Sequence, residues 1–261
     1  MEYKDILFTK NEAVANIAIN RPEVLNAIRD NTMFEIQDAL NDIEKDDSIR
    51  VVVLTGTGDK AFISGGDISI MAKGGGYQDV MHSLPAGQQI TWNMEHFPKP
   101  IIARINGIAL GGGTELALSC DIRVADETAI MGVPEINLGI IPGYGGTQRL
   151  PRIVGTGMAK KMVLTGEHIK AEEAYRIGLL DVLVPKGELD AAVAKLCKRI
   201  ASKSPIALAM GKEAINMGVQ ADLRTGLAIE SRCFCLCFGS NDRVEGMHAF
   251  LEKRKPDFKG K

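Results

Sequence analysis

The chain has 261 residues, of which 45% are hydrophobic and 25% are charged, as is ordinary for a globular protein. Its 31 Lys and Arg side chains against 33 Asp and Glu leave a formal net charge of −2, so no basic field attracts nucleic acid. Aromatic residues, at 5%, are also too few to build a base-stacking surface, and we therefore expect no nucleic-acid partner.

The first half of the chain alternates between strand and helix patterns. Short apolar runs predict strands at residues 13–20, 51–55 and 101–105, the last two buried on both faces. Helical periodicity occurs at residues 30–45, which open with the candidate N-cap residues Asp30, Asn31 and Thr32, and at residues 78–96. The apolar stripe of the first helix consists of Met33, Ile36, Leu40 and Ile43. This alternation predicts an α/β domain with buried parallel strand pairs.

The second half is helical by pattern. Helical periodicity occurs at residues 156–164, 171–178, 188–202, 206–217, 222–237 and 241–254, and Val182–Val184 is the one run here that predicts a strand. We therefore predict an α/β core at residues 1–200 and a helical C-terminal segment at residues 201–261. The apolar face near Cys233–Phe238 is larger than a peripheral helix usually carries, so it either forms a subunit interface or faces an internal core.

Other features bear on location and partners. No apolar run reaches the roughly 18 residues of a membrane span, and Met1–Asp5 lacks the basic and apolar regions of a secretory leader. The five cysteines have no metal-ligand spacing with histidine, and Cys233, Cys235 and Cys237 would point to different sides of a helix. We expect a cytoplasmic protein with reduced thiols, no membrane partner and no metal site. The basic tail is either a solvated end or a phosphate contact; it consists of Lys253, Arg254, Lys255, Lys259 and Lys261.

The first glycine cluster, Gly56–Ala61, follows the strand at 51–55 and has the G-x-G-x-x-A spacing of a dinucleotide-binding turn. That motif requires a helix to begin at the glycines. Here Gly65 and Gly66 follow instead, and glycine destabilises a first turn by about 1 kcal/mol per residue. The pattern therefore does not favour a dehydrogenase.

Two further clusters place unhindered backbone N–H groups near expected helix starts. Ser64–Ile68 forms either a donor site for an oxyanion or phosphate, or a tight turn capped by Asp67. Gly111–Gly113 precedes an apolar segment of helical length, which puts Glu115 in the first helical turn. A carboxylate is favoured there by the helix dipole.

Glu135 is the second acidic residue that is a candidate for catalysis. It lies among apolar residues, where burial raises a carboxyl pKa and lets the group act as a general acid, although a hydrogen-bonded structural glutamate fits the same pattern. Two loops with unhindered backbone donors have the geometry that a developing enolate oxygen requires, and the two acidic residues lie near them in the sequence.

Three runs of the chain resemble the signature blocks of the crotonase superfamily: residues 64–68 (SGGDI), 106–125 (NGIALGGGTELALSCDIRVA) and 134–155 (PEINLGIIPGYGGTQRLPRIVG). Residues 20–28 and 245–258 are similar to the two ends of that family, so the resemblance spans nearly the whole chain. It implies a spiral of repeated ββα units, a helical C-terminal trimerisation segment, and a homo-oligomer that is a trimer or a hexamer of two trimers.

The resemblance also implies roles for individual residues. The N–H groups of Gly66 and Gly112 would form the oxyanion hole for a thioester carbonyl. Glu115 and Glu135 match the two glutamates that distinguish hydratases from relatives with one or neither. Gly143 matches the glycine whose helix N-terminus is aimed at the thioester, and the segment matching the one that touches CoA consists of Ser64, Gly65, Asp67 and Ile68.

The activity implied is hydration of an enoyl-CoA to a 3-hydroxyacyl-CoA, without a metal or redox cofactor, since CoA is part of the substrate. The alternatives are an isomerase or hydrolase of CoA thioesters, a hydratase for alicyclic enoyl-CoA, and a non-catalytic acyl-CoA-binding or RNA-associated scaffold. Gly66 replaces an alanine usual in hydratases and Val133 replaces a common Gln, so the acyl preference stays open.

Overall fold

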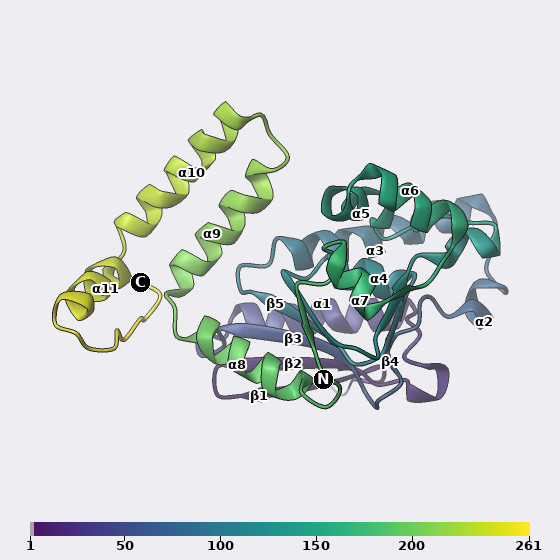
Figure 1. Ribbon diagram of the computed structural model, residues 1–261, viewed down its shortest axis with the longest axis horizontal. Helices are drawn as coiled ribbons and strands as arrows, with labels where there is room; N and C mark the ends of the chain where they lie inside the picture. The colour runs from purple at the N-terminus through teal and green to yellow at the C-terminus, as the bar shows by residue number, and fades with distance from the viewer. Residues whose placement is uncertain (1–2) are drawn as a thin grey trace.

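The computed structural model describes residues 3–261, apart from the side chains of Asp79 and His82. Met1 and Glu2 lie outside the described residues; they belong to the segment Met1–Asp5, which we predicted not to have the features of a secretory leader. Two sheets form the centre of the molecule (Figure 1). The larger has the order β1-β2-β3-β5-β7-β10, with bounds Ile6–Asn11, Val14–Ile19, Val51–Gly56, Ile101–Ile105, Ile122–Asp126 and Val182–Val184. The smaller has the order β4-β6-β8-β9, with bounds Ala61–Ile63, Ile108–Leu110, Ile130–Gly132 and Ile169–Lys170.

The chain winds as a spiral in which each turn contributes one strand to each sheet. Strands β3, β5 and β7 lie in parallel in the larger sheet, and the strand after each one, β4, β6 or β8, lies in parallel in the smaller sheet. Antiparallel pairing is confined to the ends, where β1 pairs with β2 and β8 with β9. The predicted α/β architecture of repeated ββα units is therefore confirmed.

Helices connect the strands and form the C-terminal part of the chain. Their bounds are α1 Asp30–Glu44, α2 Ile68–Met71, α3 Tyr77–Glu95, α4 Gly112–Leu118, α5 Gly146–Val154, α6 Thr156–Thr165, α7 Ala171–Arg176, α8 Leu189–Ala201, α9 Pro205–Gly218, α10 Leu223–Phe238 and α11 Asn241–Leu251. Two 3₁₀ helices, η1 Pro22–Val24 and η2 Pro134–Leu138, complete the described elements. No helix among residues 3–261 combines the length and apolar character needed to cross a bilayer.

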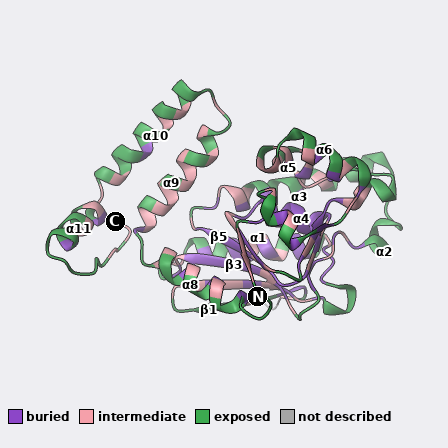
Figure 2. Ribbon diagram, in the orientation of Figure 1, coloured by how far each residue is buried: buried purple, intermediate pink, exposed green. Residues whose placement is uncertain are grey.

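The core has two parts because the β3 strand is buried on both faces, as predicted. Val52 and Leu54 face the main core, which includes the stripe of α1. Val51 and Val53 point to the other side and pack against α8 through Val193. Successive side chains of a strand alternate between faces, so an unbroken apolar run is what a strand between two helical layers requires. Figure 2 shows the resulting buried centre in purple.

Several predicted details are corrected. The strand predicted at Val182–Val184 is not alone in the second half, because β9 also lies there. Asp30 is the first helical residue of α1 and not its cap; Arg29 holds the cap position, and its N–H donates to the Thr32 hydroxyl at 3.3 Å. Helix α11 ends at Leu251, three residues before the predicted end, and Lys253 beyond it has a left-handed backbone with φ of 57°.

The C-terminal helices α9, α10 and α11 extend away from the sheets (Figure 1). On α10, Phe234 is 63% exposed, Leu236 56% and Phe238 47%, so the interpretation of this face as an internal core is wrong. Contacts with the sheet-containing part include an ion pair between Lys212 of α9 and Asp121 at 2.8 Å. In the basic tail, Arg254 pairs with Glu245, which ties that part of the tail to α11. The division into units at residues 1–200 and 201–261 stays a prediction.

Candidate active site

The glycine run at the start of α4 allows this helix to lie directly against strand β4. A β-carbon on Gly113 would overlap the carbonyl oxygen of Ile63, so only glycine permits the contact. Gly111 precedes the helix with φ of 52°, a left-handed conformation that glycine adopts at little cost. The sequence pattern indicated bare N–H donors here; the structure adds that close packing requires these glycines. Glu115, in the first turn as predicted, is only 2% exposed.

The carboxylate of Glu115 is held by backbone amides from a distant part of the chain. Its Oε1 accepts hydrogen bonds from the N–H groups of Tyr144 at 2.8 Å and Gly146 at 2.7 Å. Burial raises the pKa of Glu115, and the amides of Gly146, Tyr144 and Gly143 act against that rise. Hydrogen bonds to the charged form stabilise it, so this buried carboxylate has the environment of a proton acceptor.

Glu135, in the first turn of η2, has the opposite environment. Burial raises its pKa to about 7, and the negative charge of Glu115 adds to the shift. Its buried Oε2 has no hydrogen-bond partner among the described residues. Its Oε1 lies 3.0 Å from the position that a β-carbon on Gly111 would take, so Glu135 abuts the start of α4. The predicted rise of this pKa is confirmed, and a carboxyl that is protonated near neutrality can deliver a proton.

Gly66 and Gly112 bring two backbone donors together beside these carboxylates. The position of a β-carbon on Gly112 is 3.8 Å from the nitrogen of Gly66. Gly66 lies in an isolated bridge with Ile28, whose hydrogen bonds use Gly65 and Asp67 and leave the Gly66 N–H out. Among the backbone hydrogen bonds of residues 3–261, none is donated by Gly66 or Gly112. Two unused donors at the start of a helix are suited to an oxyanion.

The rest of the predicted CoA-binding segment is partly engaged in internal contacts. Asp67 holds the cap position of α2, but its carboxylate does not cap the helix; it accepts from Arg21 at 2.8 Å and from Ser69 at 2.6 Å. The Ser64 hydroxyl donates to the Val24 carbonyl at 3.3 Å, Gly65 is buried, and the Ile68 side chain is 54% exposed. The Asp67 N–H donates to the Ile28 carbonyl, and its carbonyl accepts from Ile70 and Met71, so the backbone of Asp67 is also engaged within the chain.

Around Gly143, the structure directs donors toward Glu115. Helix α5 begins at Gly146 after the left-handed Gly145, and the nearby amides bind the Glu115 carboxylate. The Gly143 carbonyl accepts from Gln88 Nε2 at 2.8 Å. That this helix start also approaches a thioester stays a prediction. Gly66 and Val133 are the two residues that differ from those usual in hydratases. Val133 is fully buried and Gly66 is half-exposed, so Gly66 is the one that a substrate can reach.

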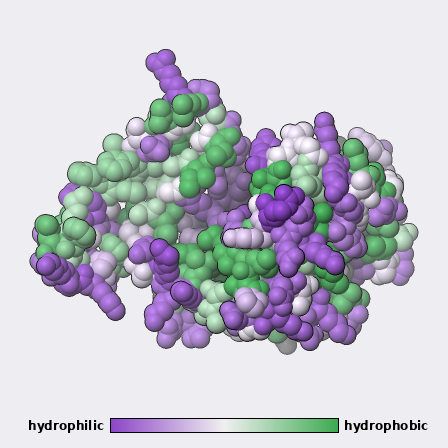
Figure 3. Space-filling view, in the orientation of Figure 1, coloured by the Kyte–Doolittle hydropathy of each residue, from purple (hydrophilic) through white to green (hydrophobic). Residues whose placement is uncertain are grey.

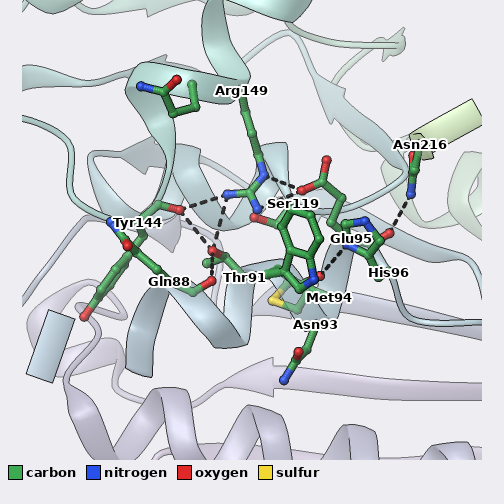
Figure 4. Close-up of polar contacts among 12 residues, drawn as sticks. Gln88, Thr91, Asn93, Met94, Glu95, His96, Ser119, Tyr144, Arg149 and Asn216 are labelled. Atoms are coloured by element: carbon green, nitrogen blue, oxygen red, sulfur yellow. Dashed lines mark hydrogen bonds and ion pairs between the residues drawn. The ribbon is translucent and has the colours of Figure 1, made fainter. Parts of the chain in front are cut away.

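Four polar side chains that the sequence analysis missed surround the carbonyl side of the 143–146 loop (Figure 4). Three lie on α3 and one on α5: Gln88, Thr91, Glu95 and Arg149. The only available sign was the spacing of the α3 residues, three and four apart on a helix, which places polar groups on one face.

No cluster of His, Cys, Asp and Glu among the described residues has a metal-binding arrangement.

The chain has close relatives among known proteins. The sequence model of the family described as enoyl-CoA hydratase/isomerase matches residues 9–261. The chain is 45% identical over 258 residues to a protein of Syntrophomonas wolfei named crotonyl-CoA hydratase, with 99% of each chain covered. It is 44% identical to the short-chain-enoyl-CoA hydratase of Clostridium acetobutylicum, covering 98% of this chain and 97% of that one.

A crystal structure of an enoyl-CoA hydratase from Bacillus anthracis superposes with a TM-score of 0.95 at 42% identity, covering 99% of this chain and 100% of that one. Fold, family model and full-length relatives agree. The chain belongs to the enoyl-CoA hydratase/isomerase family.

Proposed function

We propose that this protein is an enoyl-CoA hydratase, which adds water reversibly across the 2,3 double bond of an enoyl-CoA to give a 3-hydroxyacyl-CoA. The observation that carries the proposal is the pairing of two glutamates in opposite environments beside two unused N–H donors. Hydration needs these three parts: a base for the water, an acid for the carbon, and stabilisation of the enolate oxygen.

In the proposed reaction, water attacks C3 while Glu115 accepts one proton of that water. Electron density moves through the double bond to the thioester oxygen, where the N–H groups of Gly66 and Gly112 stabilise the negative charge. Glu135, protonated, then delivers its proton to C2 as the carbonyl re-forms. Water thus adds its hydroxyl to C3, C2 gains one proton, and the two carboxyl groups exchange their protonation states.

The residues present supply every group that this reaction requires, so we propose that it uses no metal or redox cofactor and that CoA enters only as part of the substrate. Relatives named crotonyl-CoA hydratase and short-chain-enoyl-CoA hydratase support a small linear acyl group. We also propose a cytoplasmic location, which the expected reduced thiols and the bacterial relatives support.

We propose further that the helical C-terminal segment forms a trimer or a hexamer. Exposed apolar side chains are dense on α9, α10 and α11, including Phe250 at 82%, Leu223 at 79% and Leu251 at 76%. Figure 3 shows green apolar residues over this part of the visible face. Apolar surface of this kind marks an interaction site. Light scattering that gives a mass near the 28.2 kDa of one chain would contradict the assembly.

The experiment that tests the activity follows the enoyl-thioester absorbance of crotonyl-CoA in the presence of the purified protein. A hydratase lowers this absorbance without releasing free CoA. Released thiol indicates a hydrolase, and an absorbance that rises with a 3-enoyl-CoA indicates an isomerase. A panel of linear and alicyclic enoyl-CoA esters then defines the acyl preference. No change with any ester in the panel would contradict the proposal.

The oxyanion role is tested at Gly66, where φ lies outside the left-handed region. Gly66→Ala should keep activity and melting temperature, because the added carbon meets only the flexible end of Met71, 2.9 Å away. Gly66→Pro removes the N–H and should lower kcat by about 100–1000-fold. Circular dichroism of both variants checks folding, and a Gly66→Pro protein that is folded and fully active would exclude the donor role.

A further inference from the structure

The face of α3 that meets the 143–146 loop carries polar side chains, although none of them takes part in the proposed reaction. Gln88, Thr91 and Glu95 lie on this face, and Arg149 reaches it from α5 (Figure 4). The Arg149 guanidinium donates to Glu95 Oε2 from Nε at 2.9 Å and from Nη2 at 2.8 Å. The Arg149 side chain is only 13% exposed, so this pair is held in a desolvated position.

The same guanidinium is enclosed by the loop that binds Glu115. Its Nη1 donates to the Tyr144 carbonyl at 2.9 Å and lies 3.3 Å from the Thr91 hydroxyl, which is itself 3.1 Å from that carbonyl. A β-carbon on Gly145 would overlap Nη1, so the chain passes directly over the guanidinium. Gly145 has φ of 106°, which allows this close turn.

Holding the carbonyls on one side of the loop directs the N–H groups to the other. Gln88 binds the Gly143 carbonyl, and this peptide unit carries the Tyr144 N–H that donates to Glu115. Arg149 binds the next carbonyl, between that donor and the second donor, Gly146. In a peptide unit the C=O and N–H point in opposite directions, so Gln88 sets the direction of the Tyr144 donor, and Arg149 holds the adjoining peptide unit that lies between the two donors.

We propose that Arg149 is a positioning residue: supported by Glu95 and Thr91, it fixes the 143–146 loop so that its amides hold Glu115 as an ionised general base. This inference rests on the proposed function of Glu115. Arg149 does not reach the reacting atoms; it acts through the backbone and through its charge.

Charged groups reach Glu115 from three elements. Glu135 of η2 contributes negative charge, Arg149 of α5 contributes positive charge, and Glu95 of α3 neutralises part of the latter. The Tyr144 phenol also lies nearby, and burial raises its pKa to about 12, so it is uncharged near neutrality. Strands β4 and β6 carry only apolar residues. The amides of the loop oppose the effect of burial most strongly, and the charge of Arg149 adds to them. Loss of Arg149 would remove this charge and loosen the loop, so the pKa of Glu115 would rise.

The test is Arg149→Met, measured by the pH dependence of kcat/KM for crotonyl-CoA. We expect the acidic limb to move up by about one pH unit, kcat at pH 7 to fall about 10–100-fold, and KM to change less than threefold. Arg149→Lys keeps the charge and should return the acidic limb most of the way to its wild-type position. Thr91→Val, an isosteric change, should move the limb in the same direction by a smaller amount, and it serves if Arg149→Met does not fold.

The matched control is Arg123→Met, because Arg123 is also buried and pairs with Asp181 at 2.6 Å. It should lower stability without moving the acidic limb. A normal acidic limb in Arg149→Met, or an equal shift in Arg123→Met, would overturn the positioning role while leaving the hydratase function intact.

A carboxyl ¹³C NMR titration of Glu115, assigned with Glu115→Gln, measures the same pKa without turnover. If the wild-type protein hydrates no enoyl-CoA, the proposed function fails, and the NMR titration still decides whether Arg149 lowers the pKa of Glu115. An unchanged Glu115 pKa in Arg149→Met would contradict the inference.

Discussion

Glu115 and Glu135 are the same residue type, both withdrawn from water, yet their hydrogen bonding differs. Burial raises the pKa of each. For Glu115 the amides of a distant loop oppose that rise, whereas Glu135 Oε2 has no partner among the described residues. The difference teaches that burial alone does not decide whether a carboxyl acts as an acid or as a base. The hydrogen-bond donors around each carboxyl decide this, because they stabilise only the ionised form.

The largest expected effect comes from removing either proton transfer. Glu115→Gln and Glu135→Gln should each lower kcat by about a thousandfold or more and leave KM nearly unchanged, because each carboxyl acts in the transition state and not in ground-state binding. Steady-state kinetics with crotonyl-CoA measures this. Glu127→Gln, at an exposed turn, is the control. A variant of either site that kept a tenth of the wild-type rate would remove that glutamate from its role.

A smaller effect on kcat is expected when the Glu115 carboxylate is displaced but Glu115 itself is not substituted. In Gly146→Ala the new β-carbon would lie 2.9 Å from Glu115 Oε1 and 2.9 Å from the Pro142 β-carbon. The carboxylate must shift off its amides, so kcat should fall about 100-fold. Gly157→Ala in α6, where no atom lies within 4 Å of the new carbon, should keep full activity. Equal kcat values for the two variants would show that the amide contacts do not matter.

The pH dependence should separate the two groups. Glu135 must be protonated, so kcat/KM should fall about tenfold per pH unit above its pKa of about 7, while the acidic limb reports ionisation of Glu115. The two titrations are coupled because the charges interact. In Glu135→Gln, the residual activity should lack the alkaline limb. If that limb persisted unchanged in the variant, another group would be responsible for it.

The smallest expected effect is on stability. The pKa of Glu135 rises from 4.5 to about 7 on folding, so the ionised form is disfavoured in the folded state. This cost is absent below pH 4.5, grows between pH 4.5 and 7, and is complete above pH 7. Glu135→Gln should therefore be more stable than the wild type by about 1–2 kcal/mol at pH 9, a figure reduced for partial exposure, and equal to it at pH 4.

Urea unfolding at both pH values measures this difference in unfolding free energy. Glu127→Gln again serves as the control, because its side chain is exposed. A stability difference that is the same at pH 4 and pH 9 would show that the substitution acts through packing and not through the charge of Glu135.

Local periodicity was sufficient for much of the fold. The stripe of α1, the doubly buried β3 strand and the first-turn position of Glu115 all follow from residues close together in sequence. The apolar neighbours of Glu135 likewise predicted its raised pKa. Such features depend on which side chains one turn or one strand presents, and this information is contained in short segments.

The second sheet and the environment of each glutamate were decided by tertiary structure. Strands β4, β6 and β8 have three residues each, too few to show a period, and they exist because each pairs with a strand from another turn of the spiral. Glu115 receives its amides from residues about 30 positions away, and the loop that carries them is anchored to α3 through Arg149. Whether a buried carboxyl is an acid or a base depends on donors that only the folded chain brings to it, and these contacts leave no periodic pattern in the sequence.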